Sequence, residues 1–338
     1  MKNRFLAVAL LFSALTINAA EPFRVMFYNV ENLFDCQHDT LKNDKEFLPS
    51  SVKKWDEAKY NDKLSKISKV IIATSGKNIP DLVGLCEVEN DNCLTDLTEH
   101  SPLREAGYRY VMTQSPDQRG IDVALLYQRS TFKLLDKNSI SIPNEAIERY
   151  PTRDILHVTG KVVSGDTLDV FVCHMPSRSG GEQESEPYRL FTSQILKLYA
   201  DSVMAVRKSP NVIIMGDFND YPTNNSIAKV LGATAPSQEN KVEKRKLYNL
   251  MDGKQDGTYR YKGEWGILDQ MIVSGNMLDE ENGVTTSFDK AQIVKHPFLL
   301  EEDDRYGGDT PSRTYWGNKF HGGYSDHLPI SLDINIKN

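Results

Sequence analysis

The fold is decided by the stretch Val212-Ile213-Ile214-Met215-Gly216-Asp217-Phe218-Asn219-Asp220. Its apolar first half is typical of a strand that is buried on both faces of a sheet. Because side chains alternate in extended backbone, Asp217 and Asn219 share one face. A carboxylate and an amide in that position can address one phosphate group and its nucleophile. Taken alone, the same residues would also suit a surface turn, since Gly, Asp and Asn favour turns.

Three further segments have the same character, an apolar or β-rich run that ends abruptly in a polar side chain. They are Phe23–Asn29, Asp81–Glu87 and Leu168–His174. We expect these strands to lie beside Val212–Asp217, so that their polar last residues meet at one rim of a sheet. Rigid elements present converging ligands at such a rim. The residues expected there are Asn29, Glu87, His174 and Asp217.

Helical segments alternate with the strands. Apolar residues recur at helical spacing between Trp55 and Thr74 and between Tyr188 and Val206, where they are Leu64, Ile67 and Ile71, and Phe191, Ile195 and Leu198, respectively. Further strands are expected at Ile121–Tyr127, Leu156–Val163, Ile267–Val273 and Leu328–Ile336. This α/β pattern predicts two sheets packed face to face with helices outside. A chain of 338 residues can hold one or two domains, and we prefer one, spanning residues 21–338.

The composition excludes several classes of protein. Asp and Glu total 47 residues against 40 Lys and Arg, and 39% of residues are hydrophobic, which is ordinary globular usage. The formal charge of −7 argues against a protein that coats nucleic acid without regard to sequence. It does not argue against an enzyme that acts on phosphate esters, because a local cluster of carboxylates can hold cations.

The first 20 residues match a secretory signal peptide, with basic Lys2 and Arg4, an apolar run over 5–15 and small residues at the end. We expect cleavage near Ala19 or Ala20 and export to the periplasm or the medium. Loss of this segment leaves a formal charge of −9. No later segment approaches the roughly 18 apolar residues that a membrane span requires, so we expect no stable membrane insertion.

Export permits disulfide bonds, and the four cysteines allow three pairings. Cys86 and Cys173 lie in apolar strand-like runs, where we expect buried thiols. Cys36 and Cys93 flank polar stretches and can pair. None of the four has the Cys-x-x-Cys spacing of a metal site.

A second candidate cluster lies near the C-terminus, in Gly323-Tyr324-Ser325-Asp326-His327-Leu328-Pro329. A histidine at the entrance of a strand can act as a general base when a carboxylate fixes its tautomer. Asp269 is a lone carboxylate in the apolar strand Ile267–Val273. Because a buried charge needs a partner, we expect Asp269 to pair with His327.

Taken together, these segments resemble the endonuclease/exonuclease/phosphatase superfamily, which includes pancreatic deoxyribonuclease, base-excision endonucleases, neutral sphingomyelinases and inositol polyphosphate 5-phosphatases. The resemblance spans residues 24–332, with the motifs in the family's order. It implies a four-layer α/β/β/α sandwich of two packed mixed sheets, as in deoxyribonuclease I. It also implies phosphate-ester hydrolysis assisted by Mg²⁺, or by Mn²⁺ or Ca²⁺.

The resemblance assigns roles to matching residues. Those that it makes catalytic are His174, Asp217, Asn219, Asp269 and His327, and those that it makes metal ligands are Asn29, Glu87 and Asp326. Hard carboxylate oxygens suit Mg²⁺, which usually keeps several waters and shares the substrate phosphate. The chain departs from the family at Cys86, where Gln is usual. No acidic partner of His174 can be placed, so its role as acid or as phosphate ligand stays open.

Two arginines are candidates for binding the substrate phosphate. Arg119 precedes Gly120-Ile121-Asp122, and Arg178 lies in a Gly-rich loop after His174. A solvated surface position is the alternative for each. Arg189 is expected to order the same loop. Aromatic residues form either a substrate wall or core; they are Tyr259, Tyr261, Trp265, Tyr315, Trp316 and Phe320.

The superfamily shares one metal site across DNA, RNA, lipid and sugar phosphates, so fold does not settle the substrate. We favour a phosphodiesterase, an exported monomeric endonuclease with nucleic acid as its partner. The alternatives are a phosphatase and a sphingomyelinase-like phospholipid phosphodiesterase. A non-catalytic module that binds a phosphorylated ligand would have lost the base or the metal ligands, all of which this chain retains.

Overall fold

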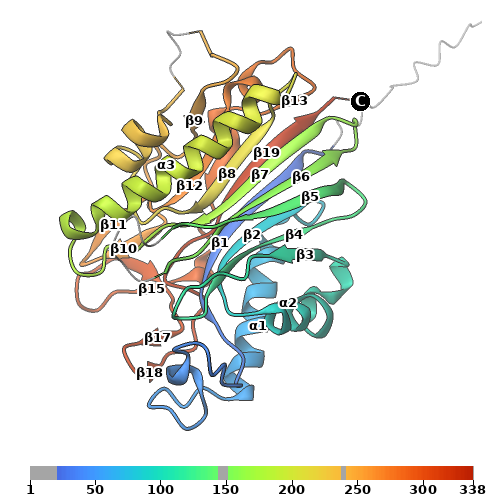
Figure 1. Cartoon of the computed structure of the whole chain (residues 1–338). Helices are drawn as coiled ribbons and strands as arrows, with labels where there is room; N and C mark the ends of the chain where they lie inside the picture. Colours follow the sequence, from blue (N-terminus) through green and yellow to red (C-terminus); the bar gives the residue numbers. More distant parts are fainter. Residues whose placement is uncertain (1–20, 144–150, 237–240, 338) are drawn as a thin grey trace, which may run out of the picture.

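The computed structural model describes residues 21–143, 151–236 and 241–337. The signal peptide expected over residues 1–20 lies outside these ranges. Two large mixed sheets dominate the structure (Figure 1). In spatial order, the seven-stranded sheet contains β13 (Val284–Thr285), β19 (Ile330–Ile336), β1 (Phe23–Leu33), β2 (Leu82–Val88), β4 (Asp122–Tyr127) and β3 (Arg109–Met112), with β14 (Ala291–Ile293) also paired to β19.

The second sheet has six strands, which in spatial order are β5 (Phe132–Ile140), β6 (Ile155–Val162), β7 (Thr167–His174), β8 (Val212–Asp217), β12 (Asp269–Ser274) and β9 (Leu247–Asn249). Three small hairpins stand apart from both sheets. They are β10 (Tyr259–Tyr261) with β11 (Glu264–Gly266), β15 (Leu300–Glu302) with β16 (Asp309–Pro311), and β17 (Tyr315–Trp316) with β18 (Lys319–Phe320). The helices are α1 (Glu57–Ala73), α2 (Asp91–Thr95) and α3 (Glu182–Val206), and the short helical turns are Lys45–Phe47, Asp96–His100, Pro102–Ala106, Ser226–Leu231, Gly275–Leu278, Phe288–Lys290 and Pro297–Leu299.

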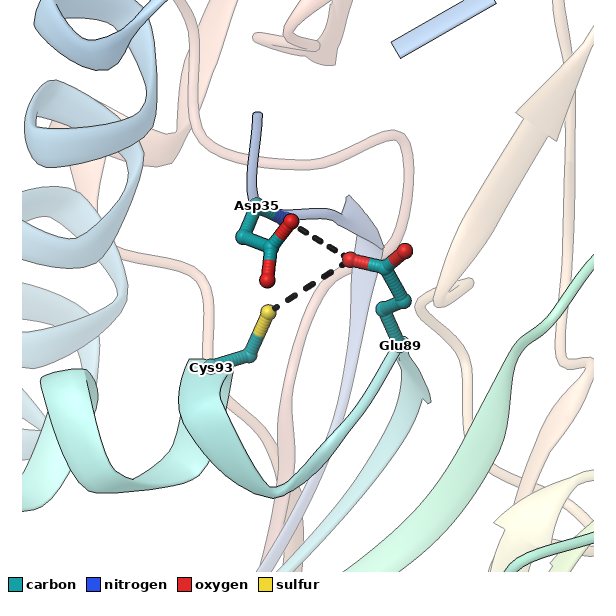
Figure 2. A group of neighbouring side chains, drawn as sticks. All are labelled: Asp35, Glu89 and Cys93. Carbon is teal, nitrogen blue, oxygen red and sulfur yellow. Dashed lines mark hydrogen bonds between the residues drawn. The ribbon is translucent and has the colours of Figure 1, made fainter. Parts of the chain in front are cut away.

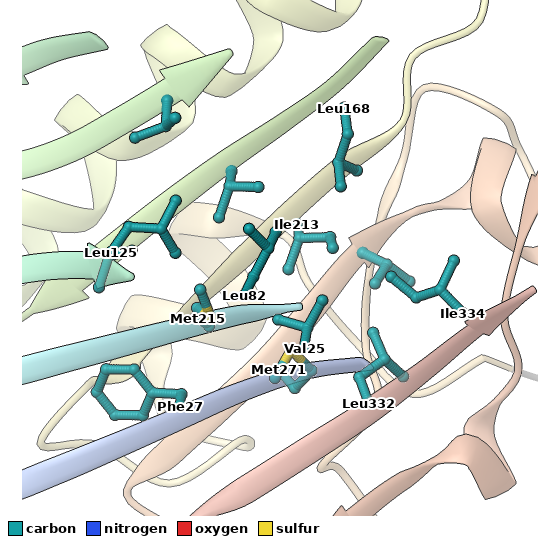
Figure 3. Close-up of a cluster of buried hydrophobic side chains, with 14 of the residues drawn as sticks. Val25, Phe27, Leu82, Leu125, Leu168, Ile213, Met215, Met271, Leu332 and Ile334 are labelled. Carbon is teal, nitrogen blue, oxygen red and sulfur yellow. The ribbon is translucent and has the colours of Figure 1, made fainter. Parts of the chain in front are cut away.

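Three apolar cores separate four layers. The central core lies between the two sheets, where side chains such as Val25 and Leu332 from one sheet meet Ile213 and Met271 from the other (Figure 3). A second core joins the seven-stranded sheet to α1 and α2. A third joins the six-stranded sheet to α3. This arrangement confirms the predicted α/β/β/α sandwich.

The expected side-by-side arrangement of the four polar-ended strands is only half right. β1 pairs in parallel with β2, and β7 pairs in parallel with β8, but the two pairs belong to different sheets. A run buried on both faces is equally compatible with either sheet, so the sequence could not distinguish one rim from two. The two rims meet because the sheets pack face to face.

The first predicted helix is confirmed. α1 begins after Asp56, whose side chain accepts a hydrogen bond of 3.0 Å from the backbone N–H of Lys59. This N-cap satisfies one of the free donors in the first turn. Leu64, Ile67 and Ile71 are buried, as their spacing predicts.

The predicted apolar face of the second helix is wrong in part. Leu198 is 58% exposed, whereas Arg189 and Thr192 are buried. The helix turns polar residues inward near its start because Arg189 forms an ion pair of 2.8 Å with buried Asp220. Periodicity of apolar residues cannot reveal a face that is held by a buried ion pair.

All four cysteines are free thiols, so the pairing of Cys36 with Cys93 is not formed. The Cys93 sulfur lies 3.6 Å from the carbonyl oxygen of Leu33 and 4.0 Å from a carboxylate oxygen of Glu89 (Figure 2). Glu89 also accepts a hydrogen bond of 2.8 Å from the backbone N–H of Asp35. Burial and the negative charge of Asp35 raise the pKa of Glu89 to about 8. Within the described ranges, no helix is long and apolar enough to cross a membrane.

An ion pair between partly exposed Arg207 and buried Asp169 stabilises the start of β7, at the opposite end of the strand from His174. Arg207 donates two hydrogen bonds, of 2.8 and 2.9 Å, to the carboxylate of Asp169. Burial raises the pKa of Asp169, but the hydrogen bonds from Arg207, His157 and Thr159 outweigh it and lower the pKa to about 2. A depressed carboxyl pKa stabilises the fold above the unfolded pKa of about 4, and this contribution is lost as pH falls towards 2.

We therefore predict that Arg207→Gln reduces the pH dependence of stability in acid. From pH 4 to pH 2, the wild-type protein should lose about 2 kcal/mol through Asp169, and the variant should lose less. Urea unfolding at several pH values measures this difference. The exposed neighbour Lys208→Gln serves as the control, and parallel curves for wild type and Arg207→Gln would contradict the assignment.

Candidate active site

Backbone register places three chemistry-bearing residues in a row at one end of the six-stranded sheet. Asp217 is the last residue of β8, His174 is its parallel partner on β7, and Asp269 is its antiparallel partner on β12. All three are buried. The strand patterns predicted these positions, and the register explains why Asp217 lies at the centre.

Gly216 is required for the close pairing of β7 and β8. A Cβ atom at this position would lie 2.2 Å from the carbonyl oxygen of Cys173, which is backbone and cannot rotate away. The glycine before Asp217 therefore holds the central carboxylate against β7.

The rim of the seven-stranded sheet contributes Asn29 and Glu87. The side-chain amide of Asn29 donates a hydrogen bond of 3.1 Å to a carboxylate oxygen of Asp217, which joins the two sheets. The other end of the Asn29 side chain accepts a hydrogen bond of 2.9 Å from the backbone N–H of Glu31. One carboxylate oxygen of Glu87 accepts from the backbone N–H of Asn32, and the other lies 4.0 Å from Nε2 of His174.

Backbone with positive φ is concentrated where the rims of the two sheets meet. Of the six non-glycine residues with positive φ in the described ranges, four lie at the strand ends beside the site: Glu31, Asn32, Glu87 and Asn219, with φ of 51°, 60°, 64° and 50°. The registers of β1 with β2 and of β2 with β4 shift at the same place. Such strained conformations cluster at functional sites, where the surrounding structure holds them.

His327 forms the predicted pair with Asp269. Its Nδ1 lies 2.8 Å from Oδ2 of Asp269, and its Nε2 lies 3.8 Å from Oδ2 of Asp217. Burial alone would lower the pKa of His327, but the negative charges of Asp269 and Asp217 outweigh burial and raise this pKa well above its usual value. The ring of Tyr259 packs on the imidazole, with 4.9 Å between the ring centroids.

Asp217 is a carboxylate with an unusual proton affinity. Burial raises its pKa to about 7; the positive charge of His327 opposes this shift, and the negative charge of Asp269 adds to it. Its second oxygen accepts a hydrogen bond of 2.9 Å from the backbone N–H of Asn219. Groups whose pKa lies near neutrality are well suited to proton transfer.

His174 faces the same centre from the opposite side. Its Nε2 lies 3.7 Å from Oδ2 of Asp217, while its buried Nδ1 has no hydrogen-bond partner. Burial lowers the pKa of His174 well below its usual value, and the positive charges of Arg153 and Arg119 act in the same direction. A neutral imidazole donates one hydrogen bond and does not serve as a strong acid, so the geometry favours the role of phosphate ligand.

Sequence reasoning missed two arginines that shape the site. Buried Arg153 donates a hydrogen bond of 2.6 Å to the carbonyl oxygen of Met175, just after His174. Arg313 donates a hydrogen bond of 2.9 Å to Asp326 and forms an ion pair of 3.3 Å with Glu31. Neither arginine lies in a recognisable motif, and each acts through segments distant in sequence.

The predicted residues converge on a cavity of about 670 Å³ that we call the catalytic cavity. Asp269 is bonded to His327 and is the one predicted site residue that does not line this cavity. The predicted site residues that line it are Asn29, Glu87, Arg119, His174, Arg178, Asp217, Asn219, Asp326 and His327.

The two candidate phosphate-binding arginines differ in their surroundings. Arg119 is half exposed, and its guanidinium donates to Asn32 and lies 3.7 Å from Glu87. Arg178 instead donates to the backbone carbonyl of Asn219 at 2.6 Å and to Asp220 at 3.1 Å. Arg119 is therefore the more accessible of the two to a phosphate, whereas Arg178 holds the loop that carries Asn219.

The expected ordering role of Arg189 agrees with its contacts, because its guanidinium bonds the carbonyl oxygens of Ser177 and Glu182.

The donor set fits a hard divalent cation. Asn29, Glu87 and Asp326, each with a side-chain oxygen, line the catalytic cavity beside the buried carboxylate of Asp217. Burial raises the pKa of Asp217, and the carboxylates of Asp269 and Glu87 add to this shift against the opposing charge of His327. A bound cation would relieve the repulsion among these carboxylates.

The aromatic candidates divide between wall and core. Tyr259, Tyr261 and Trp316 line cavities, whereas Tyr315 is buried against Trp55. Trp265 and Phe320 are partly buried and pack on the core between α1 and the seven-stranded sheet.

Comparison with known proteins agrees with this geometry. Residues 24–336 match the model of the Endonuclease/Exonuclease/phosphatase family. The chain belongs to this family. Its members are metal-dependent phosphoester hydrolases, and so is this protein. No curated protein matches the chain.

Solved structures share the fold at low sequence identity. The human Nocturnin catalytic domain with bound sulfate is 18% identical, with a TM-score of 0.56 and coverage of 94% of this chain and 95% of that one. A humanized zebrafish (D. rerio) TDP2 is 17% identical, with a TM-score of 0.57 and coverage of 93% and 98%. A Bacteroides thetaiotaomicron mannosyl-6-phosphatase is 15% identical, with a TM-score of 0.57 and coverage of 92% and 99%.

We predict that Asp269→Asn lowers kcat for phosphate-ester hydrolysis by about 10²- to 10⁴-fold, because His327 loses the charge that fixes its tautomer and stabilises its protonated form. Initial rates of phosphate release measure the effect. Asp136→Asn, an exposed change of the same chemistry on β5, should retain the wild-type rate. Full turnover by Asp269→Asn would exclude the pairing from catalysis.

Proposed function

We propose that this family member is an exported hydrolase of small phosphate esters that uses Mg²⁺, with Mn²⁺ or Ca²⁺ as alternatives. The observation that carries the reaction class is the position of Asp217, buried within 4 Å of both His174 and His327. Such a constellation can position a water molecule, accept its proton and bind the phosphate under attack.

The proton-transfer residues act from one side of the cavity. Asp217 orients the attacking water, and His327 in its neutral form accepts a proton of that water through Nε2. Asp269, bonded to Nδ1, fixes the tautomer and stabilises the imidazolium that forms. The raised pKa of His327 reflects the same stabilisation.

The phosphate-binding residues act from the other sides. Neutral His174 and the amide of Asn219 donate hydrogen bonds to phosphate oxygens, and Arg119 supplies a positive charge. Glu87, Asp326 and Asn29 would hold the divalent cation. When bound, the cation supplies positive charge that stabilises the phosphate oxygens and the leaving group.

A small ester fits the surroundings of the site better than a long polyanion. The segment Glu301-Glu302-Asp303-Asp304 lines a cavity that adjoins the catalytic cavity, and it offsets the basic residues there, so this side of the site offers no net positive charge to a nucleic-acid backbone. One fold neighbour is described as a mannosyl-6-phosphatase. Exposed Tyr261 and Trp316 stand among charged residues rather than in the apolar loop that a phospholipid substrate would need.

The endonuclease favoured by the sequence is the second candidate. Arg119 and Arg178 at the cavity wall favour it, and another fold neighbour, D. rerio TDP2, is described as complexed with a single-strand DNA product. A monomeric state remains a prediction.

We expect the mature protein, residues 21–338, to hydrolyse p-nitrophenyl phosphate or bis-p-nitrophenyl phosphate in Mg²⁺, and to lose activity with a chelator and in His327→Ala. Supercoiled plasmid is assayed in parallel. Ester turnover without nicking supports a small-ester hydrolase. Nicking that vanishes in both controls establishes the nuclease. If the protein has neither activity, the proposal is refuted.

Export is tested separately. In cells that express the full chain with its native N-terminus, we expect the recovered protein to begin just after Ala19 or Ala20. Mass spectrometry of the N-terminal peptide of protein from the periplasm or medium reads this directly. A cytoplasmic protein that retains residues 1–20 would contradict the proposed localisation.

A further inference from the structure

A second cavity lies beside the catalytic cavity. It has a volume of about 810 Å³, and we call it the outer cavity. It shares Tyr259, Tyr261 and Asp326 with the catalytic cavity, so the two cavities adjoin at these residues. The Tyr259 end of the outer cavity is therefore the end nearest to the reacting centre.

The outer cavity is a built structure of three hairpins, β10–β11, β15–β16 and β17–β18, which lie at one end of the molecule (Figure 1). Arg260 joins the first hairpin to the second. Its guanidinium donates to Asp303 at 3.2 Å and to the carbonyl oxygen of Asp309 at 2.9 Å, and also bonds the carbonyl oxygen of Gly307. Trp316 joins the third hairpin to the second, because its indole N–H donates to Glu301 at 3.2 Å.

Exposed aromatic side chains gather in this cavity. Tyr261, Trp316 and Tyr306 are 59%, 47% and 45% exposed, the highest values among the large aromatic side chains in the described ranges, and all three line it. Solvent-exposed aromatic surface gathered in a concave site marks a place where a ligand is covered. Each ring has a cation 5.1 Å from its centroid: Lys262 over Tyr261, Arg313 over Trp316 and Arg305 over Tyr306. The ring surface that stays exposed can bind C–H surfaces or other rings.

The charges in the outer cavity favour a neutral ligand. The guanidinium of Arg260 is occupied by Asp303 and by backbone carbonyls. Arg313 pairs with Asp326, and His321 lies against Glu301. The remaining lining charges are negative on Glu302 and Asp304 and positive on Lys262 and Arg305. Carboxylates only accept hydrogen bonds, so they suit a ligand that is rich in hydroxyl donors.

We propose that the outer cavity is a subsite for the leaving group of the substrate, and that this group is a sugar. The proposal rests on the proposed function of the catalytic cavity. The aromatic faces pack on the C–H faces of the sugar ring, and the carboxylates accept hydrogen bonds from its hydroxyl groups. The phosphate that the sugar carries then lies in the catalytic cavity, beside Tyr259 and His327.

The test compares kcat/KM of the mature protein for glucose 6-phosphate, thymidine 5′-monophosphate and p-nitrophenyl phosphate. Wild type should prefer glucose 6-phosphate over both of the other esters. In Tyr306→Ala and Trp316→Ala, the ratio of kcat/KM for glucose 6-phosphate to that for p-nitrophenyl phosphate should fall about tenfold, mainly through KM. Trp316→Phe retains a ring and should restore part of the preference.

Tyr199→Ala is the matched control, because Tyr199 is an aromatic residue of α3 that is 41% exposed and lies outside both cavities. It should leave the ratio unchanged. Preference for the nucleotide, or an unchanged ratio in both Tyr306→Ala and Trp316→Ala, overturns the sugar subsite while turnover of p-nitrophenyl phosphate still supports the proposed function. If the protein turns over none of the three esters, both the proposed function and the sugar subsite are refuted.

Discussion

The site depends on the burial of one carboxylate, Asp217, where two sheets meet. Its oxygens receive hydrogen bonds from Asn29 of the opposite sheet and from the backbone of Asn219. Removing a carboxylate from water costs several kcal/mol unless donors or cations compensate. The raised pKa of Asp217 shows that compensation is incomplete in the protein alone. This incompletely compensated burial of the Asp217 carboxylate suits the site to bind a cation and to transfer a proton.

The strained backbone around Asp217 also helps to form the site. Glu87 and Asn219 adopt positive φ where an ordinary strand would continue, so their side chains turn into the catalytic cavity. Conformations of this kind cost roughly 1–3 kcal/mol each. The paired sheets and their three apolar cores are large enough to hold them. The stability of the sandwich thus keeps in place a site with a strained backbone and an incompletely compensated buried carboxylate.

The parts that sequence could predict are those set by local pattern. Apolar runs with polar ends located Asn29, Glu87, His174 and Asp217, and the lone carboxylate in an apolar strand identified Asp269 as the partner of His327. Together with the resemblance, these runs predicted the four-layer sandwich.

The parts that it could not predict depend on long-range contacts. Whether the strand ends share one sheet or two is decided by tertiary packing, which no local pattern encodes. Arg153 and Arg313 contact segments far away in the chain, and the inward polar face of α3 depends on the ion pair of Arg189 with Asp220. The hairpins of the outer cavity are too short to show periodicity.

The hydrogen bond from Asn29 to Asp217 joins the two sheets, and we expect these two residues to act as one unit in catalysis. A double-mutant cycle with Asn29→Ala and Asp217→Ala tests it most directly, with kcat for phosphate-ester hydrolysis as the measured quantity. The account predicts that the double variant loses little more activity than Asp217→Ala alone, because residues of one unit are not additive. A loss in the double variant equal to the product of the two single losses would show that the residues act independently and would contradict the account.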